Sequence, residues 1–235
     1  MVYKKNKIRD FIVDNVSDHP KDIINITARN FGVSKQAVHR HINILIRRGV
    51  LEAEDKTKSR KYTLKPIVHE KIAFFIHKDL AEDKIWRLNI SNFFKNFSPN
   101  IIDICHQGFT EIFNNVIDHS NGMTVRIVIK ITSPKIEIKI IDNGIGIFTK
   151  IKNELGLEDE RHAILELSKG KLTTDPEKHS GEGIFFTSRI FDEFLISSKQ
   201  YFFSHYEDDD WLLELDNKKK VLEGTIITMA IKTNS

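Results

Sequence analysis

The sequence has little cysteine and no long apolar run, and both absences narrow the class of protein. Cys105 is the only cysteine among 235 residues, so no intrachain disulfide can form and a secreted, disulfide-stabilised fold is not expected. No stretch of about 18 apolar residues is present, so no membrane span or membrane partner is expected. The segment from Met1 to Lys7 lacks the apolar core of a signal peptide. We therefore expect a cytoplasmic protein.

Composition and charge indicate a globular chain with two unlike parts. Apolar residues make up 40% and charged residues 29%, which allows a buried core in one or two domains. Residues 1–65 carry 15 Lys/Arg against 7 Asp/Glu, whereas the remainder carries 21 against 26. A basic region attached to an acidic one favours a polyanion, such as nucleic acid, as the partner of the basic region. The alternative is a solvated basic surface.

The pattern of residues 1–65 predicts three helices followed by a β-hairpin. Apolar residues recur at helical spacing in each of the three segments. The turn before the third helix ends in Ser34, a good N-cap, and the helix itself ends at Gly49. Residues 50–53 and 61–64 then read as two strands around a polar tip.

This order of elements resembles a winged helix-turn-helix, and residues 26–42 are similar to the turn and recognition helix of that family. The resemblance implies double-stranded DNA as a partner, with the third helix reaching base edges and the hairpin reaching phosphates. A module used only for protein contacts is the alternative. The residues expected at the DNA are Ser34, Lys35, Gln36, His39, Arg40, Lys58 and Arg60.

Residues 66–104 are expected to form a helical connector that couples two domains. The pattern is mostly helical from 67 to 76 and again from 80 to 97, before Ser98-Pro99 starts the next helix. The aromatic residues of this segment favour packing, or a dimer surface, over a cofactor site. Cys105 lies on the apolar side of the next helix, so we expect a core residue and not a nucleophile.

A polar helix face follows at residues 111–119. Glu111 and Asn115 are four residues apart and therefore face the same way, with Asp118 and His119 about one turn further on. An acid and an amide on one face can orient water and complete a magnesium shell, because Mg²⁺ takes oxygen ligands and keeps several waters. An exposed helix face without function is the alternative.

A second motif is a strand that ends in an aspartate and a glycine turn. Residues 125–130 and 135–140 alternate apolar and polar side chains, which predicts paired antiparallel strands. The second strand brings Asp142 to its end, where Gly144 and Gly146 allow a sharp turn and a close backbone approach. Such a carboxylate can accept a hydrogen bond from the exocyclic amine of adenine. Asp-Asn-Gly is also ordinary turn chemistry.

A third motif is the glycine-rich turn at 179–183, which opens a helix at 184–191. Free backbone N–H groups at a helix start suit phosphate oxygens. No Lys-Ser/Thr follows the glycines, so this is not a Walker loop, and the spacing of a Rossmann turn is also absent. Further strands are predicted at 194–198, 201–203, 211–215 and 225–231.

Together, and in this order, the three motifs resemble the nucleotide site of the GHKL ATPases, the Bergerat-fold family of gyrase, chaperone, histidine kinase and mismatch-repair ATPases. The resemblance covers residues 105–232 and implies an α+β protein in which residues 105–235 form a mixed sheet covered by helices. It implies ATP and Mg²⁺ as ligands, Glu111 as general base, Asn115 as metal ligand and Asp142 as adenine reader. The other expected nucleotide contacts are Asp118, His119, Gly144, Gly146, Lys178, Ser180, Gly181, Gly183 and Thr225.

The segment between the two glycine motifs, residues 147–180, resembles the mobile lid of that family. Its later half is polar, and a short helix is expected at 161–167. His69 and His77 precede the fold but lack an acid-flanked acceptor motif, so histidine autophosphorylation is not expected.

The co-occurrence of the two resemblances predicts a DNA-binding transcriptional regulator that binds Mg-ATP and uses its binding, or its hydrolysis as an ATPase, to switch the binding of DNA or of a partner protein. In this hypothesis a homodimer closes its lids over Mg-ATP and changes the spacing of two winged heads. The alternative is a serine/threonine protein kinase of anti-sigma-factor type that acts on a partner protein. A third possibility is a scaffold that binds ATP without hydrolysing it.

Overall fold

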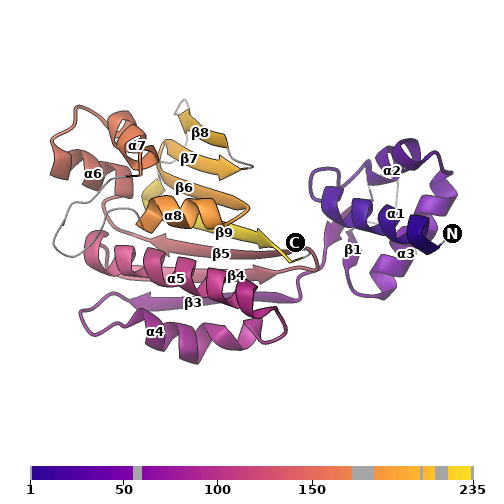
Figure 1. Ribbon diagram of the computed structural model, residues 1–235, viewed down its shortest axis with the longest axis horizontal. Helices are drawn as coiled ribbons and strands as arrows, with labels where there is room; N and C mark the ends of the chain where they lie inside the picture. Colours follow the sequence, from indigo (N-terminus) through magenta and orange to yellow (C-terminus); the bar gives the residue numbers. More distant parts are fainter. Residues whose placement is uncertain (1, 55–59, 171–182, 207–208, 215–221, 234–235) are drawn as a thin grey trace. The chain divides into compact units, whose positions relative to one another are not determined.

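A computed structural model of the chain describes residues 2–54, 60–170, 183–206, 209–214 and 222–233 (Figure 1). The chain divides into two compact units. The first comprises residues 1–69 with Lys130–Lys135, and the second comprises Glu70–Ile129 with Ile136–Thr233. None of the helices within these described ranges is long and apolar enough to cross a membrane.

The first unit consists of three helices and a small hairpin, as predicted. The helices are α1 (Val2–Asn15), α2 (Ile23–Phe31) and α3 (Lys35–Arg47), and the antiparallel hairpin joins β1 (Leu51–Glu54) to β2 (Lys61–Leu64). Their apolar faces meet in one core that includes Ile12, Val16, Ile23, Val38 and Ile42.

The turn between α2 and α3 is built as the sequence indicates. Gly32 has φ 62°, a left-handed conformation that glycine adopts without strain. The Ser34 hydroxyl accepts a hydrogen bond from the Ala37 N–H at 3.2 Å, so Ser34 caps α3. The elements are confirmed, whereas the assignment to the winged helix-turn-helix family stays a prediction.

The second unit is built on a seven-stranded sheet with the order β3-β4-β5-β9-β6-β7-β8. The bounds are β3 Val68–Phe75, β4 Thr124–Ile131, β5 Lys135–Asp142, β6 Glu193–Lys199, β7 Tyr201–Tyr206, β8 Asp209–Glu214 and β9 Leu222–Lys232. The strands expected between residues 125 and 231 are therefore confirmed.

The sheet is antiparallel, so the expectation of a mixed sheet is wrong. The pairs β6–β7, β6–β9 and β7–β8 are antiparallel, and hydrogen bonds from Ile67 to Ile131 and from Ile76 to Met123 flank an antiparallel β3–β4 pair. The alternation of side chains reveals which face of a strand is buried, but it carries no information on the direction of a partner strand that is distant in sequence.

The segment expected to be helical at 67–76 is in fact strand β3, and this prediction is wrong. Val68–Phe75 forms an edge strand beside β4, with most of its side chains exposed or half-buried. Apolar and polar residues alternate only weakly in this segment, so the sequence pattern did not distinguish a strand from a helix. The open backbone of β4 decides the outcome, because pairing with it satisfies the N–H and C=O groups of β3.

The region 80–97 is helical but irregular. It contains α4 (Glu82–Ile85), a π-helix (Trp86–Ile90) and a 3₁₀ helix (Ser91–Phe94). Trp86 and Phe94 are buried, with ring centroids 5.2 Å apart, and Trp86 also contacts Phe109. The aromatic residues therefore serve packing, as expected.

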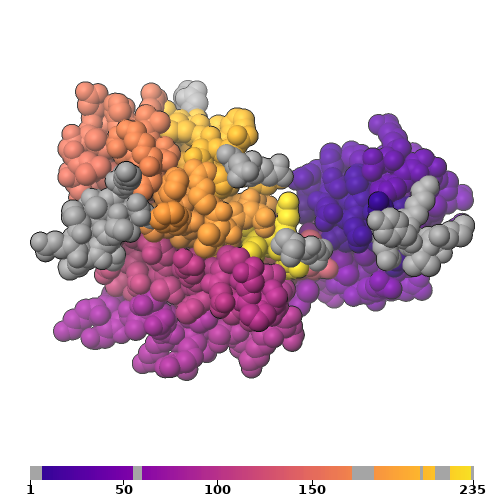
Figure 2. All heavy atoms as spheres, in the orientation of Figure 1, coloured from indigo at the N-terminus to yellow at the C-terminus, as the bar shows by residue number. Residues whose placement is uncertain are grey.

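The remaining helices pack on the sheet or, in the case of α6, against a neighbouring helix. They are α5 (Pro99–His119), α6 (Ile147–Leu155), α7 (Glu160–Ser168) and α8 (Gly183–Ile190). Helix α5 contacts β9, α8 contacts β6 and α7 contacts β7 (Figure 1), and the space-filling view shows α8 in orange between α7 and α5 (Figure 2). Cys105 of α5 is fully buried, and burial raises its pKa to about 12, which confirms a core residue.

Candidate functional site

Asp142 lies at the end of β5 in a buried corner of the sheet. Only 5% of its surface is exposed. Its Oδ1 atom accepts a hydrogen bond from the Gly144 N–H at 2.8 Å, and the backbone and side chain of Thr225 also donate to this carboxylate. Burial raises the pKa of Asp142 above its ordinary value, and the bonds from Gly144 and Thr225 oppose this shift. A buried carboxylate with fixed donors is a specific acceptor for a ligand group.

Thr225 connects this corner to the start of the next helix. Its Oγ1 atom accepts a hydrogen bond from the Ile147 N–H at 3.0 Å, at the first turn of α6. Because the same hydroxyl donates to Asp142, Thr225 joins β5, β9 and α6 at one point. Thr225, which the family resemblance implies as a nucleotide contact, therefore touches the expected adenine reader.

Close backbone packing leaves no room for side chains at two glycines of the corner. A Cβ atom on Gly144 would collide with the carbonyl of Ser120, and one on Gly224 would collide with the carbonyl of Asp142. The Ile145 N–H also donates to the Ser120 carbonyl at 3.0 Å. The turn after Asp142 is thus fastened to the end of α5.

Asn143 holds the other side of the same junction. Its Oδ1 atom accepts hydrogen bonds from the backbone N–H groups of Met123 and Thr124, both at 2.9 Å. Asp118 and His119 lie on the last turn of α5, immediately before Ser120. The C-terminal end of α5 and the Asp142 turn are therefore neighbours, as the order of motifs implies.

The polar face of α5 carries Glu111 and Asn115. The Asn115 amide nitrogen donates to the Glu111 carbonyl at 2.9 Å and to the Glu111 Oε1 atom at 3.3 Å. Because the Asn115 amide nitrogen is hydrogen-bonded to Glu111, the amide oxygen is the atom that is left to bind a cation. Within the described residues, no group of three or more His, Cys, Asp or Glu side chains is arranged to hold a metal.

The first residue of α8 meets the α5 face. A Cβ atom on Gly183 would collide with the carboxylate of Glu111, so the start of α8 lies against this side chain. The first and third sequence motifs are therefore in contact. Lys178, Ser180 and Gly181, which the sequence also assigns to the nucleotide, lie outside the described residues.

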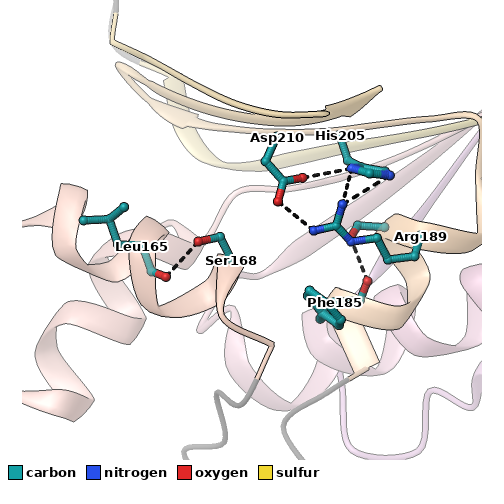
Figure 3. A network of polar contacts seen from close by, with 7 residues as sticks. Leu165, Ser168, Phe185, Arg189, His205 and Asp210 are labelled. Atoms are coloured by element: carbon teal, nitrogen blue, oxygen red, sulfur yellow. Dashed lines mark hydrogen bonds and ion pairs between the residues drawn. The ribbon is translucent and has the colours of Figure 1, made fainter. Parts of the chain in front are cut away.

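A polar network centred on the buried His205 fixes α8 to the sheet (Figure 3). Arg189 of α8 donates to Asp210 of β8 at 2.6 Å, and its guanidinium also contacts the buried His205 of β7. The His205 Nδ1 atom lies 2.9 Å from the Asp210 Oδ1 atom, and the Arg189 guanidinium lies 4.9 Å from the ring centre of Phe185. The orientation of the helix that begins at Gly183 is thus set by two strands.

The residues predicted to contact DNA lie in the first unit. Ser34 caps α3, and Lys35, Gln36, His39 and Arg40 are exposed on its N-terminal half. Arg60 is exposed beside β2, with its guanidinium 5.4 Å from the ring centre of Tyr62. Lys58 lies outside the described residues.

Sequence reasoning missed two residues of the corner. Ser120 meets the turn after Asp142 through its backbone carbonyl, and no side-chain pattern can reveal such a contact. Ser198 of β6 is buried, and its hydroxyl donates to the Gly224 carbonyl at 3.0 Å. The only indication of Ser198 in the sequence was a polar residue at the end of a strand that is otherwise largely apolar.

The residues of all three motifs that the structure describes converge on one end of the sheet and the adjoining helices. The sequence profile of the histidine kinase-like ATPase domain matches residues 84–201, and the chain belongs to this family. A search among curated proteins finds no significant match. The family match begins within the irregular helices before α5 and ends at the start of β7.

Proposed function

We propose that the second unit binds Mg-ATP at the corner formed by Asp142 and Thr225 and along the polar face of α5. The observation that carries this proposal is a buried carboxylate held by fixed donors from two residues, Gly144 and Thr225, next to a helix that bears Glu111 and Asn115. Family membership supports the same ligand. The experiment is a calorimetric titration of ATP and Mg²⁺ into the wild type and into Asp142→Asn.

The described residues fit these ligands. The Asp142 carboxylate would accept a hydrogen bond from the exocyclic amine of adenine, which guanine does not offer at that position. The Asn115 amide oxygen would bind the magnesium ion, which when bound neutralises charge on the phosphates. Backbone N–H groups at the start of α8 suit the phosphate oxygens.

We further propose that the protein is a serine/threonine protein kinase of anti-sigma-factor type. Glu111 would act as general base and accept the proton of the attacking hydroxyl on a partner protein. The phosphoryl group would pass from ATP to that oxygen, and ADP would leave. The family match, and the position of Glu111 against the first residue of α8, support this activity.

The kinase proposal predicts label transfer from [γ-³²P]ATP to a protein that co-purifies with the chain. Label on a serine or threonine of that partner, absent with Glu111→Gln, is the expected result. Release of inorganic phosphate alone would indicate an ATPase. Binding without release or transfer would indicate the scaffold.

The second candidate function is a DNA-binding regulator controlled by ATP. The specific observation in its favour is the set of exposed polar and basic side chains on the N-terminal half of α3, together with the exposed Arg60 beside β2. In this proposal a homodimer carries two such heads, and Mg-ATP changes their spacing on double-stranded DNA.

The regulator proposal is tested with a random pool of duplex DNA about 30 base pairs long. Affinity is measured by fluorescence anisotropy with and without Mg-ATP, and with Lys35→Glu and Arg40→Glu in the first unit. Binding that depends on both residues and changes with Mg-ATP is expected. Equal DNA affinity with and without Mg-ATP and in both variants would exclude the regulator and leave the kinase as the proposed function.

A further inference from the structure

Ser198 occupies a special place on β6, directly opposite Thr225 in the β6–β9 ladder. The regular register ends immediately after this pair, because Lys199 is opposite Leu222. Gly224 lies within this irregularity and has φ 78°. A bulged ladder leaves backbone groups without their usual partners.

The Ser198 hydroxyl supplies the missing partner. It donates to the Gly224 carbonyl at 3.0 Å, and only 1% of the Ser198 surface is exposed. The bond therefore fixes the backbone of the residue immediately before Thr225. A buried carbonyl without this donor would carry a desolvation cost.

The same hydroxyl also supports the turn that follows Asp142. Gly146 has φ 89°, and a Cβ atom on it would collide with the Ser198 Oγ atom. Gly146 precedes Ile147, whose N–H group is bonded to Thr225. Ser198 thus contacts both backbone segments that hold Asp142 in place.

We propose that Ser198 is a positioning residue for adenine recognition, acting through Thr225 and Asp142. This inference rests on the proposed binding of ATP by the second unit. With the hydroxyl in place, Thr225 keeps its bonds to Asp142 and Ile147, and the carboxylate keeps its direction. Without it, the Gly224 carbonyl must find another partner, and the bulge and the Gly146 turn shift.

The test compares ATP with purine riboside triphosphate, which lacks the exocyclic amine, by calorimetry on the full chain. We expect Ser198→Ala to lower ATP affinity about tenfold and to change affinity for the amine-free analogue less than about twofold. The preference for ATP would therefore shrink in the variant. A residue that only stabilises the fold would weaken both ligands equally.

Ser197→Ala is the matched control. Ser197 is the neighbouring residue of β6 and is 5% exposed, but side chains alternate along a strand, so it faces the other side of the sheet. The Ser197→Ala variant should prefer ATP over the amine-free analogue as strongly as the wild type does. An equal loss of this preference in Ser197→Ala and Ser198→Ala would overturn the inference.

A second variant, Ser198→Cys, replaces the hydroxyl with a slightly larger group that is a weaker donor, and it is used if Ser198→Ala does not fold. Its preference for ATP should lie between those of the wild type and the alanine variant. A wild-type preference in a folded Ser198→Ala or Ser198→Cys variant would overturn the inference and leave ATP binding intact. Absence of ATP binding by the wild type would instead overturn the proposed function, and this inference with it.

Discussion

The two ends of the candidate site are built in different ways. The corner around Asp142 is held by close backbone packing and a shared hydroxyl: Gly144 and Gly224 pack against carbonyl groups, and the Thr225 hydroxyl bonds both to Asp142 and to the start of α6. The opposite end is made of side chains, with Glu111 and Asn115 on one helix and Gly183 at the start of another.

This difference has a physical consequence. Backbone packing cannot adjust without moving strands, so the corner presents its carboxylate in one fixed direction. A glutamate on a helix can change rotamer, so the α5 end can adapt to a ligand. We infer that base recognition depends on rigidity, whereas chemistry at the phosphates depends on side chains that can move.

The largest effect is expected for Asp142→Asn. The amide has nearly the same shape, but it replaces a charged acceptor with a group that presents N–H donors to the adenine amine. We expect ATP affinity to fall about a thousandfold, or roughly 4 kcal/mol, as measured by calorimetry. Asp209→Asn on exposed β8 is the control and should bind like the wild type. Tight binding by a folded Asp142→Asn would contradict the assigned base corner.

The next effect compares two glycines, one at each end of the site. Gly224→Ala places a Cβ atom against the Asp142 carbonyl at φ 78°, and we expect a loss of about 3 kcal/mol in the free energy of unfolding. In Gly183→Ala the nearest atoms to the new Cβ are those of the Glu111 carboxylate, which can rotate away, so the loss in the free energy of unfolding should stay below about 1 kcal/mol. Urea denaturation measures both. Similar losses would mean that the two ends are equally rigid.

Glu111→Gln separates binding from chemistry. The amide keeps the size of the side chain but cannot accept the hydroxyl proton, so we expect turnover of ATP to fall about a hundredfold. ATP affinity should change less than about threefold, because the base corner is untouched. A phosphate-release assay and calorimetry on the same sample measure the two quantities. Loss of affinity with unchanged turnover would reverse the roles assigned to the two ends.

The smallest effect concerns pH. Because burial raises the pKa of Asp142, acidification protonates this acceptor sooner than an ordinary aspartate, and ATP affinity should fall with it. Thr225→Val removes a side-chain bond that lowers this pKa, so the loss of affinity should begin at higher pH. The folded state disfavours the charged form, so this group's contribution to stability rises as pH falls through the folded-state pKa. If ATP affinity depended on pH in the same way in the wild type and in Thr225→Val, this result would contradict the assigned bond from the Thr225 hydroxyl to Asp142.

The local elements were predictable because they depend on short-range patterns. Alternation marked β4 and β5, helical spacing marked α5, and Ser34 marked the start of α3. Helix α6, directly after Gly146, was not expected, since its sequence was assigned to a lid. Strand β3 was misassigned because its partner, β4, lies about 50 residues further along the chain.

The sequence by itself determined the three motifs, their order and the residue types that suit a nucleotide site. The tertiary structure decided which of them touch: Gly183 against Glu111, Thr225 on Asp142, and Ser198 between two glycines. Spacing along the chain specifies what a helix face or strand end presents. Contacts between distant segments depend on how the strands pair and on where the backbone is close enough to exclude a side chain, and no short-range pattern encodes these.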